Sequence, residues 1–589
     1  MKKTFLNLLF CVLLSPVLAQ PVVTVTTENP DESIQNGIAR AEVDGAVGNV
    51  TYYWSNPNTP LSSSQCSGLD EGCPVKLIVT DETGSAEFEV VVPAISFPEK
   101  MNAIFKPIVD AIGTVMYWDP LAALGIRSGE IYDDNGNKVL HPNGDPVVKP
   151  VRFIVIWLIF GAIYFTIYMR FINLRGFRHS IELVRGKFSK SSNPGEVSPF
   201  QALATALSGT LGLGNISGVA IAMAIGGPGA TFWMIIAGFL GMSSKFVECT
   251  LGVKYRKIND LNEVSGGPMY YLSEGLKKSG LAKLGKILAL IFAILCIGGA
   301  IGGGNMFQSN QVMAQFSTTI PQLSGYSWLI GLLLAFFAGL VMIGGIKKIA
   351  TVTDKLVPLM IAIYMIAAFV IIGANIGEIG TAFYSIFHGA FSADAAKGGF
   401  VGVMMLGFQR AAFSNEAGIG SASIAHSASK TDKPVSEGIV ALLEPFIDTV
   451  VVCTITALVL VFTGYAADPQ GLTGSQLTNA AFTSQIPWFK WVLLVSILLF
   501  AYATILSWGY YGYKSWTYLF GESAISKYSY DLIYLSCTWL GAMVGLGAVM
   551  DFSDMMILGM ALPNLAGLFL MRKEVRQDLK NYWMEMKLK

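Results

Sequence analysis

The segment TALSGTLGLGNISG, residues 205–218, places polar groups and exposed backbone inside an apolar stretch of membrane-spanning length. Each glycine inside a helix costs about 1 kcal/mol relative to alanine. An interrupted helix is tolerated at bilayer depth only where its backbone faces protein or a water-filled cavity, and such half-helix ends bind ions and zwitterions in transporters. Close helix packing through the small residues is the alternative. A dinucleotide-binding fingerprint is excluded, because it would need glycine at Ser217 and a preceding strand. The glycines are Gly209, Gly212, Gly214 and Gly218.

A second interruption follows about 200 residues later, in AAFSNEAGIG at residues 411–420. Here Ser414, Asn415, Glu416 and Gly418 break another long apolar segment. Two interrupted spans in corresponding parts of a chain are the best sequence indication of a transporter binding site. The pair therefore favours a transport site over simple helix packing.

The composition indicates a polytopic membrane protein. The 589 residues are 53% hydrophobic and 14% charged, with a mean hydropathy of +0.53. Soluble proteins carry about 25% charged residues. The net charge is zero, so nothing indicates a nucleic-acid partner. The seven cysteines show no metal-binding spacing, and no Walker A, HExxH or GxSxG motif is present, so the sequence does not favour an enzyme.

The N-terminal part has the features of an exported segment. Residues 1–19 predict a signal peptide, with two lysines, an apolar core and a Val-Leu-Ala exit. In residues 20–97, short runs of alternating apolar and polar residues are separated by turn residues, which predicts a small β-sandwich. The pattern resembles the immunoglobulin-like repeats of bacterial surface proteins. Cys66 and Cys73 either form a disulfide or remain free thiols. Residues 98–150 predict an interfacial helix and a hairpin.

Residues 151–589 form the predicted membrane domain, in which the charges of the loops indicate topology. Loops such as KYRKIND and GGIKKIATVTDK are basic, whereas 315–325, 464–488 and 551–553 contain no Lys or Arg. The positive-inside rule then places the N-terminal domain outside the cell inner membrane and the C-terminus in the cytoplasm. The eleven expected spans are 151–170, 200–225, 229–252, 285–314, 326–345, 355–375, 398–426, 437–463, 489–513, 530–550 and 554–571.

One span followed by two sets of five gives each set an interrupted first helix. The first set begins from inside and the second from outside, which predicts an inverted repeat. The expected fold is therefore an all-α polytopic membrane protein with a 5+5 inverted repeat after one extra helix.

Several motifs are similar to those of the alanine/glycine–cation symporter family: FQALATALSGTLGLGNISGVA, GGPMYYL, GGGNMFQSNQV, FSNEAGIGSASIAH and ATILSWGYYG. The resemblance implies a LeuT-like fold and Na⁺-coupled uptake of a small neutral amino acid such as alanine or glycine. Three positions depart from the family pattern. Leu213 replaces a threonine, Gln409 replaces a lysine, and Ala503 replaces a serine beside Thr504.

The resemblance also implies site residues. The expected substrate pocket comprises Thr210, Gly212, Gly214, Gln308, Phe413 and Trp508. For Na⁺, one position would use Asn215 and the Thr210 carbonyl, with the substrate carboxylate. A second would use the Ser208 and Leu211 carbonyls and the Thr504 hydroxyl. Neutral oxygens of this kind suit a hard cation.

Ionisable residues inside spans are candidates for coupling. Glu248, Glu416, Glu444 and Asp448 are such residues, and Glu416 is expected either to hold a gate or to pair with Arg410. Proton coupling through one of them is the alternative to Na⁺. His179 and His426 are expected to be lipid-facing or loop residues rather than ligands. A receptor that uses the β domain to bind a surface partner is the alternative from another functional class, although a simple stabilising cap is the preferred role for that domain.

Overall fold

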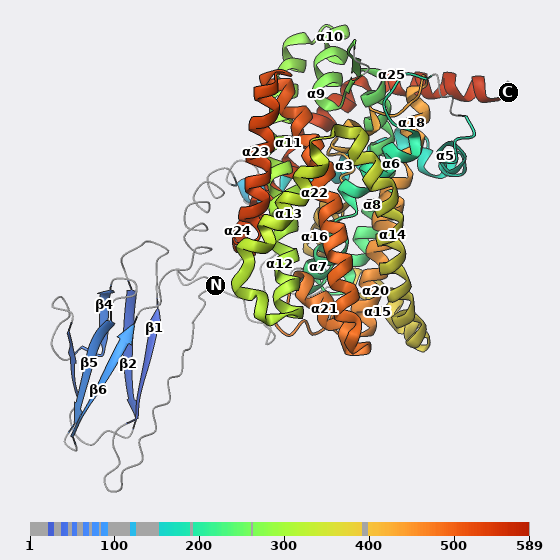
Figure 1. The fold of residues 1–589 in the computed structure, drawn as a ribbon. Coiled ribbons are helices and arrows are strands. Elements are labelled where there is room, and N and C mark those ends of the chain that lie inside the picture. Colours follow the sequence, from blue (N-terminus) through green and yellow to red (C-terminus); the bar gives the residue numbers. More distant parts are fainter. Residues whose placement is uncertain are drawn as a thin grey trace. The chain divides into compact units, whose positions relative to one another are not determined.

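A computed structural model describes residues 22–28, 37–44, 50–55, 63–69, 74–81, 84–91, 113, 118–124, 152–188, 193–260, 263–391 and 399–587. The chain divides into two compact units, Met1–Ile108 and Val109–Lys589 (Figure 1). The predicted signal peptide and hairpin lie outside the described residues. Of the predicted interfacial helix, residues 113 and 118–124 are described, and they include the short helix α2, Pro120–Ala123.

The first unit contains two three-stranded antiparallel sheets, ordered β1-β2-β4 and β3-β5-β6. Alternation of apolar and polar residues along the strands explains why these sheets form. In β5, Val75, Leu77 and Val79 are buried, whereas Lys76 and Thr80 are exposed. Trp54 and Cys66 join these residues in one apolar core. Because Cys73 is outside the described residues, the disulfide remains a prediction. The strands are β1 Val22–Glu28, β2 Gly37–Asp44, β3 Thr51–Trp54, β4 Gln65–Leu69, β5 Pro74–Asp81 and β6 Gly84–Val91.

The second unit is a helical bundle that begins with α3, Phe153–Tyr168, and continues with five membrane-length segments. The first and third of these are not uniform α-helices, because π-helical turns interrupt them. The segments are α6 Pro199–Thr210 with η1 Gly214–Gly218 and α7 Val219–Gly226; α8 Gly229–Lys254; α11 Ala282–Ile301 with η3 Gly302–Met306 and α12 Phe307–Thr319; α13 Ser327–Met342; and α14 Gly345–Ala374.

Five further segments complete the bundle, and the first of them is again divided by a break. They are α16 Gly399–Asn415 with α17 Ala422–His426; α18 Pro434–Val440 with α19 Leu443–Pro445, η7 Phe446–Cys453 and α20 Thr454–Phe462; α22 Lys490–Phe520; α23 Ala524–Gly541; and α24 Leu546–Gly559 with α25 Ala561–Lys587. This order of one helix, five segments and five segments confirms the predicted LeuT-like arrangement.

Short elements occupy the connections between the long segments. They are α4 Ile172–Arg175, α5 Phe177–Val184, β7 Lys257–Ile258, β8 Val264–Ser265, α9 Pro268–Tyr270, η2 Tyr271–Gly275, α10 Leu276–Lys278, η4 Pro321–Tyr326, η5 Ile376–Glu378, α15 Ile379–Phe391, α21 Gly474–Gln485 and η8 Pro487–Phe489.

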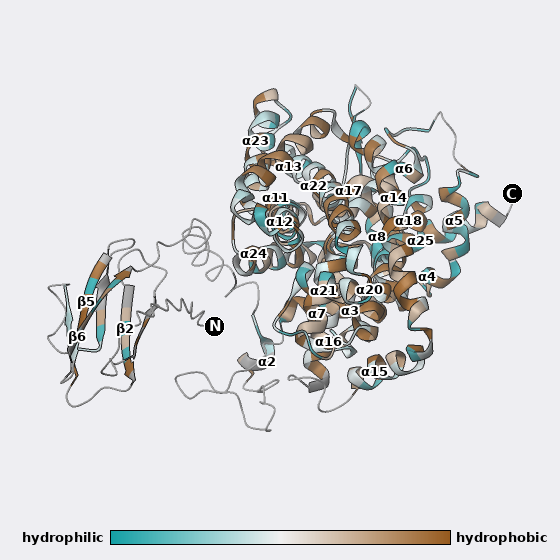
Figure 2. Cartoon of the chain, turned by 60° about the horizontal axis from the view of Figure 1, so that its bottom comes forward, coloured by the Kyte–Doolittle hydropathy of each residue, from teal (hydrophilic) through white to brown (hydrophobic). Residues whose placement is uncertain are grey.

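Seven helices of the described residues are long and apolar enough to cross a membrane, or eight if the bent pair Pro199–Thr210 and Gly214–Gly226 is one span. The helix α3 is apolar but has only 16 residues. Leu332, Phe336 and Leu340 on α13 remain exposed, as expected of side chains that face lipid. Hydrophobic residues predominate along many helices, whereas α5 is largely hydrophilic (Figure 2). The chain is therefore a multi-pass membrane protein.

Several predicted loop boundaries are wrong. The segment GGIKKIATVTDK was expected to be a loop, but residues 345–355 begin α14, and the expected loop 464–488 contains α21. Residues 551–553 were expected to form an outer loop, but they lie within α24, and the preceding turn occupies residues 542–545. That turn also lacks Lys and Arg, so the charge argument for topology is unaffected.

Candidate functional site

The first break separates α6 from η1 and α7. The helix α6 begins with a capping box, in which Ser198 and Gln201 satisfy each other's backbone N–H groups. It ends at Thr210, because Leu211 has a non-helical ψ of 64°, and the two halves are bent by 48°. A Cβ on Gly212 would lie 2.5 Å from Thr504 Oγ1. Glycine is therefore needed for close approach between α6 and α22.

The second break follows Asn415 at the end of α16. Glu416, Gly418 and Gly420 all have positive φ, at 57°, 86° and 97°. A non-glycine residue rarely takes this conformation, and it persists only where the surroundings enforce it. Two hydrogen bonds hold Glu416: Trp508 Nε1 donates to Oε1 over 3.0 Å, and the Ser421 hydroxyl donates to Oε2. The strained turn is thus fixed by α22 and by its own continuation.

The two breaks meet at Asp448, which lies on the π-helical segment η7. Asn215 Nδ2 donates to Asp448 Oδ1 over 2.7 Å, and Ser414 Oγ donates to Oδ2 over 2.9 Å. Thr449 Oγ1 also donates to Oδ2, over 2.6 Å. These residues are buried, and Asn215 Oδ1 has no hydrogen-bond partner in the described part of the chain. A buried carboxylate and an unsatisfied amide oxygen therefore lie between the broken helices.

The structure brings several predicted substrate residues together. The Leu213 N–H donates to Gln308 Oε1 over 3.2 Å, and a Cβ on Gly212 would lie 3.3 Å from the same oxygen. On η3, Gly303 lies opposite Phe413, and a Cβ on Gly304 would overlap Trp508. A Cβ on Gly303 would also overlap Ile557 of α24. Glycines on η3 thus allow three large side chains to pack closely against that segment.

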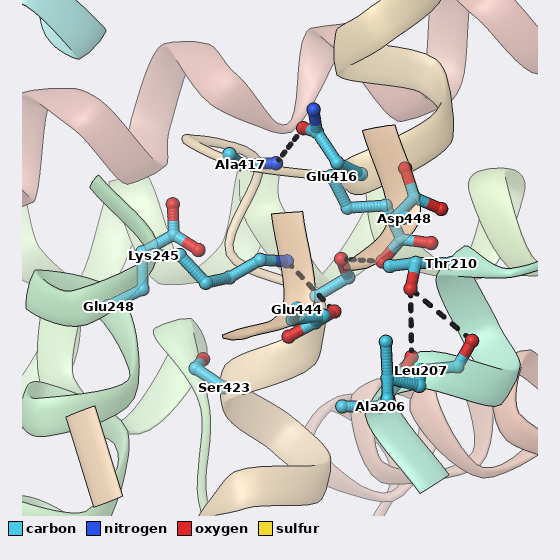
Figure 3. Close-up of polar contacts among 12 residues, drawn as sticks. Ala206, Leu207, Thr210, Lys245, Glu248, Glu416, Ala417, Ser423, Glu444 and Asp448 are labelled. Carbon is cyan, nitrogen blue, oxygen red and sulfur yellow. Dashed lines mark hydrogen bonds and ion pairs between the residues drawn. The ribbon is translucent and has the colours of Figure 1, made fainter. Parts of the chain in front are cut away.

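Thr210 was expected to offer its polar groups to the substrate and to Na⁺, but in the structure they bond within its own segment. Its hydroxyl lies 3.3 Å from the carbonyls of both Ala206 and Leu207 and donates back into α6 (Figure 3). The Thr210 carbonyl accepts from the Gly212 N–H over 2.7 Å. Thr210 therefore lies at the break, but its polar groups are engaged locally.

The second predicted ion position is partly assembled. Thr504 Oγ1 donates to the Ser208 carbonyl over 2.9 Å, so these two proposed ligands are adjacent across α22 and α6. Leu211 lies three residues further on and is buried. Ala503, which replaces a serine of the family pattern, is also buried. The hydroxyl that Ala503 lacks is therefore missing from an interior position.

The suggested pair of Arg410 and Glu416 is replaced by two separate pairs. Arg410 forms an ion pair with Asp554 on α24, and Gln409 Nε2 also donates to Asp554, over 2.8 Å. The Arg410 guanidinium lies 5.3 Å from the ring centre of Phe413. Glu416, by contrast, bonds to Trp508 and Ser421. Because the turn at Glu416 directs its carboxylate toward α22, it does not serve as the partner of Arg410.

Sequence reasoning missed a buried charge network that joins α8 to the segments after the second break. Lys245 Nζ on α8 lies 3.2 Å from Glu444 Oε1, and both side chains are fully buried (Figure 3). His426 Nδ1 lies 2.7 Å from Glu437 Oε1, and His426 Nε2 lies 3.5 Å from Glu444 Oε2. The expectation that His426 is a loop residue is wrong, because it ends α17 and is inaccessible to solvent. Lys245 could have been found, since it is ionisable within an apolar span.

Comparisons with known proteins agree with this geometry. The family model described as the sodium:alanine symporter family matches residues 135–589. The chain belongs to the sodium:alanine symporter family. It is 40% identical over 436 residues to the sodium/alanine symporter AgcS of Methanococcus maripaludis, covering 73% of this chain and 94% of that protein. It is 36% identical to the probable sodium/glutamine symporter GlnT of Bacillus subtilis, covering 73% and 88%.

Among solved structures, the chain is similar to MhsT in complex with L-phenylalanine. The TM-score is 0.44 at 15% sequence identity, and the match covers 63% of this chain and 88% of that one. Membership of a symporter family confirms the prediction of a secondary transporter rather than an enzyme.

Proposed function

We propose that this symporter-family protein imports a small neutral amino acid, such as alanine or glycine, together with Na⁺. Transport would proceed by alternating access around the two helix breaks. The family assignment and the relatives named as sodium/alanine and sodium/glutamine symporters support this proposal. Interrupted helices that converge on one buried position provide the site that such transport requires.

The observation that carries the proposal is the unsatisfied Oδ1 of Asn215. Its Nδ2 is fixed by Asp448, and the side chain is fully buried, so the amide oxygen cannot turn to solvent. A buried acceptor without a partner costs about 1–3 kcal/mol. A Na⁺ ion beside Asn215, with the Asp448 carboxylate close by, would satisfy that oxygen and balance the buried negative charge.

The amino acid would bind between the same breaks. The N–H groups that begin η1 after Gly212 suit its carboxylate, because they lie at the positive end of the helix. Carbonyls around Phe413–Asn415 suit its ammonium. Phe413 and Trp508 would limit the side chain. One methylene is worth only about 1–3 kcal/mol in such a pocket, so alanine and glycine would differ modestly.

A second Na⁺ is proposed at the Ser208 and Leu211 carbonyls and the Thr504 hydroxyl. The hydrogen bond from Thr504 Oγ1 to the Ser208 carbonyl, which brings two of these oxygens together across α22 and α6, supports this position. Replacing the family serine with Ala503 removes one oxygen. We therefore expect this position to bind Na⁺ more weakly than it would with a serine.

The orientation follows from the loop charges and is part of the proposal. The β domain, residues 20–97, would lie outside the inner membrane after removal of residues 1–19. The basic loops and the C-terminus would face the cytoplasm. Membrane lipid would then surround the exposed apolar faces of the bundle, and a surface partner of the β domain is not required for transport.

The test is uptake of labelled alanine and glycine into proteoliposomes under imposed Na⁺, H⁺ or K⁺ gradients. We expect uptake to require Na⁺ and to fall at least about tenfold in Asn215→Ala, because tenfold corresponds to 1.4 kcal/mol of lost ion binding. Asn581→Ala is the matched control, since Asn581 is exposed on α25.

Other outcomes would change the assignment. Uptake driven by H⁺ alone would retain transport but move coupling to Glu416. No uptake under any gradient would favour the receptor alternative.

A further inference from the structure

Buried hydroxyl groups, linked through the Thr205 backbone carbonyl, run along α6 from the first break toward the start of that helix. Ser208 Oγ contacts Ser507 Oγ of α22, and Ser507 Oγ donates to the Thr205 carbonyl over 2.9 Å. Thr205 Oγ1 lies 3.2 Å from Thr353 Oγ1 of α14. All four side chains are fully buried. These residues, Ser208, Ser507, Thr205 and Thr353, are called the hydroxyl ladder below.

The Ser208 end of the hydroxyl ladder coincides with the second proposed ion position. The Ser208 carbonyl accepts from Thr504 Oγ1 over 2.9 Å, while the Ser208 hydroxyl begins the ladder. An ion leaving the Ser208 and Leu211 carbonyls would therefore meet the ladder at once.

The other end of the ladder leads to an incompletely satisfied carboxylate. Asp354 follows Thr353 on α14, and its Oδ2 accepts from Gln201 Nε2 over 3.1 Å. Its Oδ1 is buried and has no hydrogen-bond partner in the described residues. Gln201 is held by the capping box of α6, because its Oε1 accepts from the Ser198 N–H over 3.1 Å. The carboxylate is thus bonded to Gln201, the residue whose backbone carbonyl accepts from the Thr205 hydroxyl of the ladder.

The chemistry of this line suits a hard monovalent cation. Hydroxyl, carbonyl and carboxylate oxygens are its preferred ligands. From residue 208 to residue 201 the helix rises about 10 Å at 1.5 Å per residue. Neutral oxygens bind an ion weakly enough to release it, and a terminal carboxylate attracts it onward, as in other ion pathways. The basic segment GGIKKIATVTDK, which contains Asp354 and begins α14, is one of the segments that the loop charges assign to the cytoplasm.

We propose that the hydroxyl ladder and Asp354 form the route by which the co-transported Na⁺ leaves the second ion position toward the cytoplasm. This inference rests on the proposed function and assigns residues to its release step. Asp354 is a positioning residue at the exit, and the ladder hydroxyls replace water around the moving ion.

The alternative role for the same contacts is purely structural. The hydroxyl ladder also joins α6 to α14 and α22, and loss of a buried hydrogen bond typically costs about 0.5–1.5 kcal/mol. A structural role predicts that net uptake and substrate exchange decline together, in step with the melting temperature. A release route predicts that net uptake alone declines.

The experiment compares Asp354→Asn and Thr353→Val with Thr351→Val in proteoliposomes. Thr351 lies on the same helix but is exposed, and its hydroxyl bonds to the Lys347 carbonyl. Net alanine uptake driven by a Na⁺ gradient requires Na⁺ release inside. Alanine exchange with high Na⁺ on both sides does not, because Na⁺ can remain bound.

We expect net uptake by Asp354→Asn and Thr353→Val to fall about tenfold, equivalent to a 1.36 kcal/mol higher release barrier. Exchange, the melting temperature and Thr351→Val should stay near the values of the unaltered protein. Asp354→Glu should restore net uptake. Equal losses of uptake and exchange, or no loss in either variant, would overturn the release route alone. Uptake by the unaltered protein that does not need Na⁺ would overturn the proposed function and the route together.

Discussion

Gly212 occupies a position where even one methyl group has no room. An added Cβ would lie 2.5 Å from Thr504 Oγ1 and 3.3 Å from Gln308 Oε1, and both atoms belong to proposed ion or substrate ligands. The residue therefore affects packing and binding geometry at once.

We expect Gly212→Ala to abolish most uptake and to destabilise the protein by about 1–3 kcal/mol, the usual cost of overpacking. Thermal unfolding in detergent and alanine uptake would measure the two effects. Gly373→Ala is the control, because a Cβ there meets nothing within 4 Å. Unchanged uptake in Gly212→Ala would contradict the placement of the site at the first break.

Residue-level prediction from the sequence succeeded where the chain itself carries the signal. Glycines within an apolar span identified the first break, and Ser414–Glu416 identified the second. Pairings between distant residues could not be read in the same way. Asn215 and Asp448 are 233 positions apart, and Arg410 and Asp554 are 144 apart. Nothing local to Arg410 distinguishes Asp554 from Glu416 as a partner, since that choice depends on how α24 packs.

At the scale of elements, the buried charge network joins α8 to α17, α18 and α19. Lys245 and Glu444 are fully buried, and His426 and Glu437 extend the contacts along the second broken span. Charges in such surroundings need partners, because desolvation is costly. The network therefore determines how α8 packs against the segment that follows the second break.

Lys245→Met should lower the free energy of unfolding by about 3–5 kcal/mol, because Glu444 would remain buried without its cation. The double variant Lys245→Met, Glu444→Gln should recover part of that loss, since neither group would then carry charge. Melting temperatures in detergent measure both. Lys286→Met is the control, because Lys286 is exposed on α11. A double variant less stable than Lys245→Met would show that the pair contributes little.

Helix boundaries were the least predictable elements. The run from 530 to 571 is apolar almost throughout, so periodicity alone could not locate its turn. Dividing this run into spans of ordinary length placed a loop at 551–553, but these residues lie within α24, and Asp554 is buried there beside Arg410.

At the scale of the whole molecule, the chain joins a small β unit to a membrane bundle. The composition of each part predicted this division, since alternating short runs precede long apolar ones. The β unit has its own core around Trp54, Cys66 and Leu77. Its role could not be predicted, because a sandwich of this kind has no recognisable chemical motif.

Deletion of residues 20–97, with the signal peptide retained, should leave alanine uptake within about twofold, since independent units usually contribute additively. Uptake per amount of protein in the membrane is the relevant measurement. Complete loss of uptake in a correctly inserted, folded protein would show instead that the β unit takes part in transport.

The glycines on α11 and η3 have a consequence for redesign of the substrate range. Gly299, Gly303 and Gly304 already have the smallest possible side chain, and Trp508, Phe413 and Ile557 fill the space in front of them. These large side chains cover the glycines, so the glycines themselves offer no further room for a substrate. Variants that accept bulkier amino acids can arise only by shortening the large side chains opposite. Any substitution at the glycines narrows the pocket, so selection for larger and for smaller substrates would act on different helices.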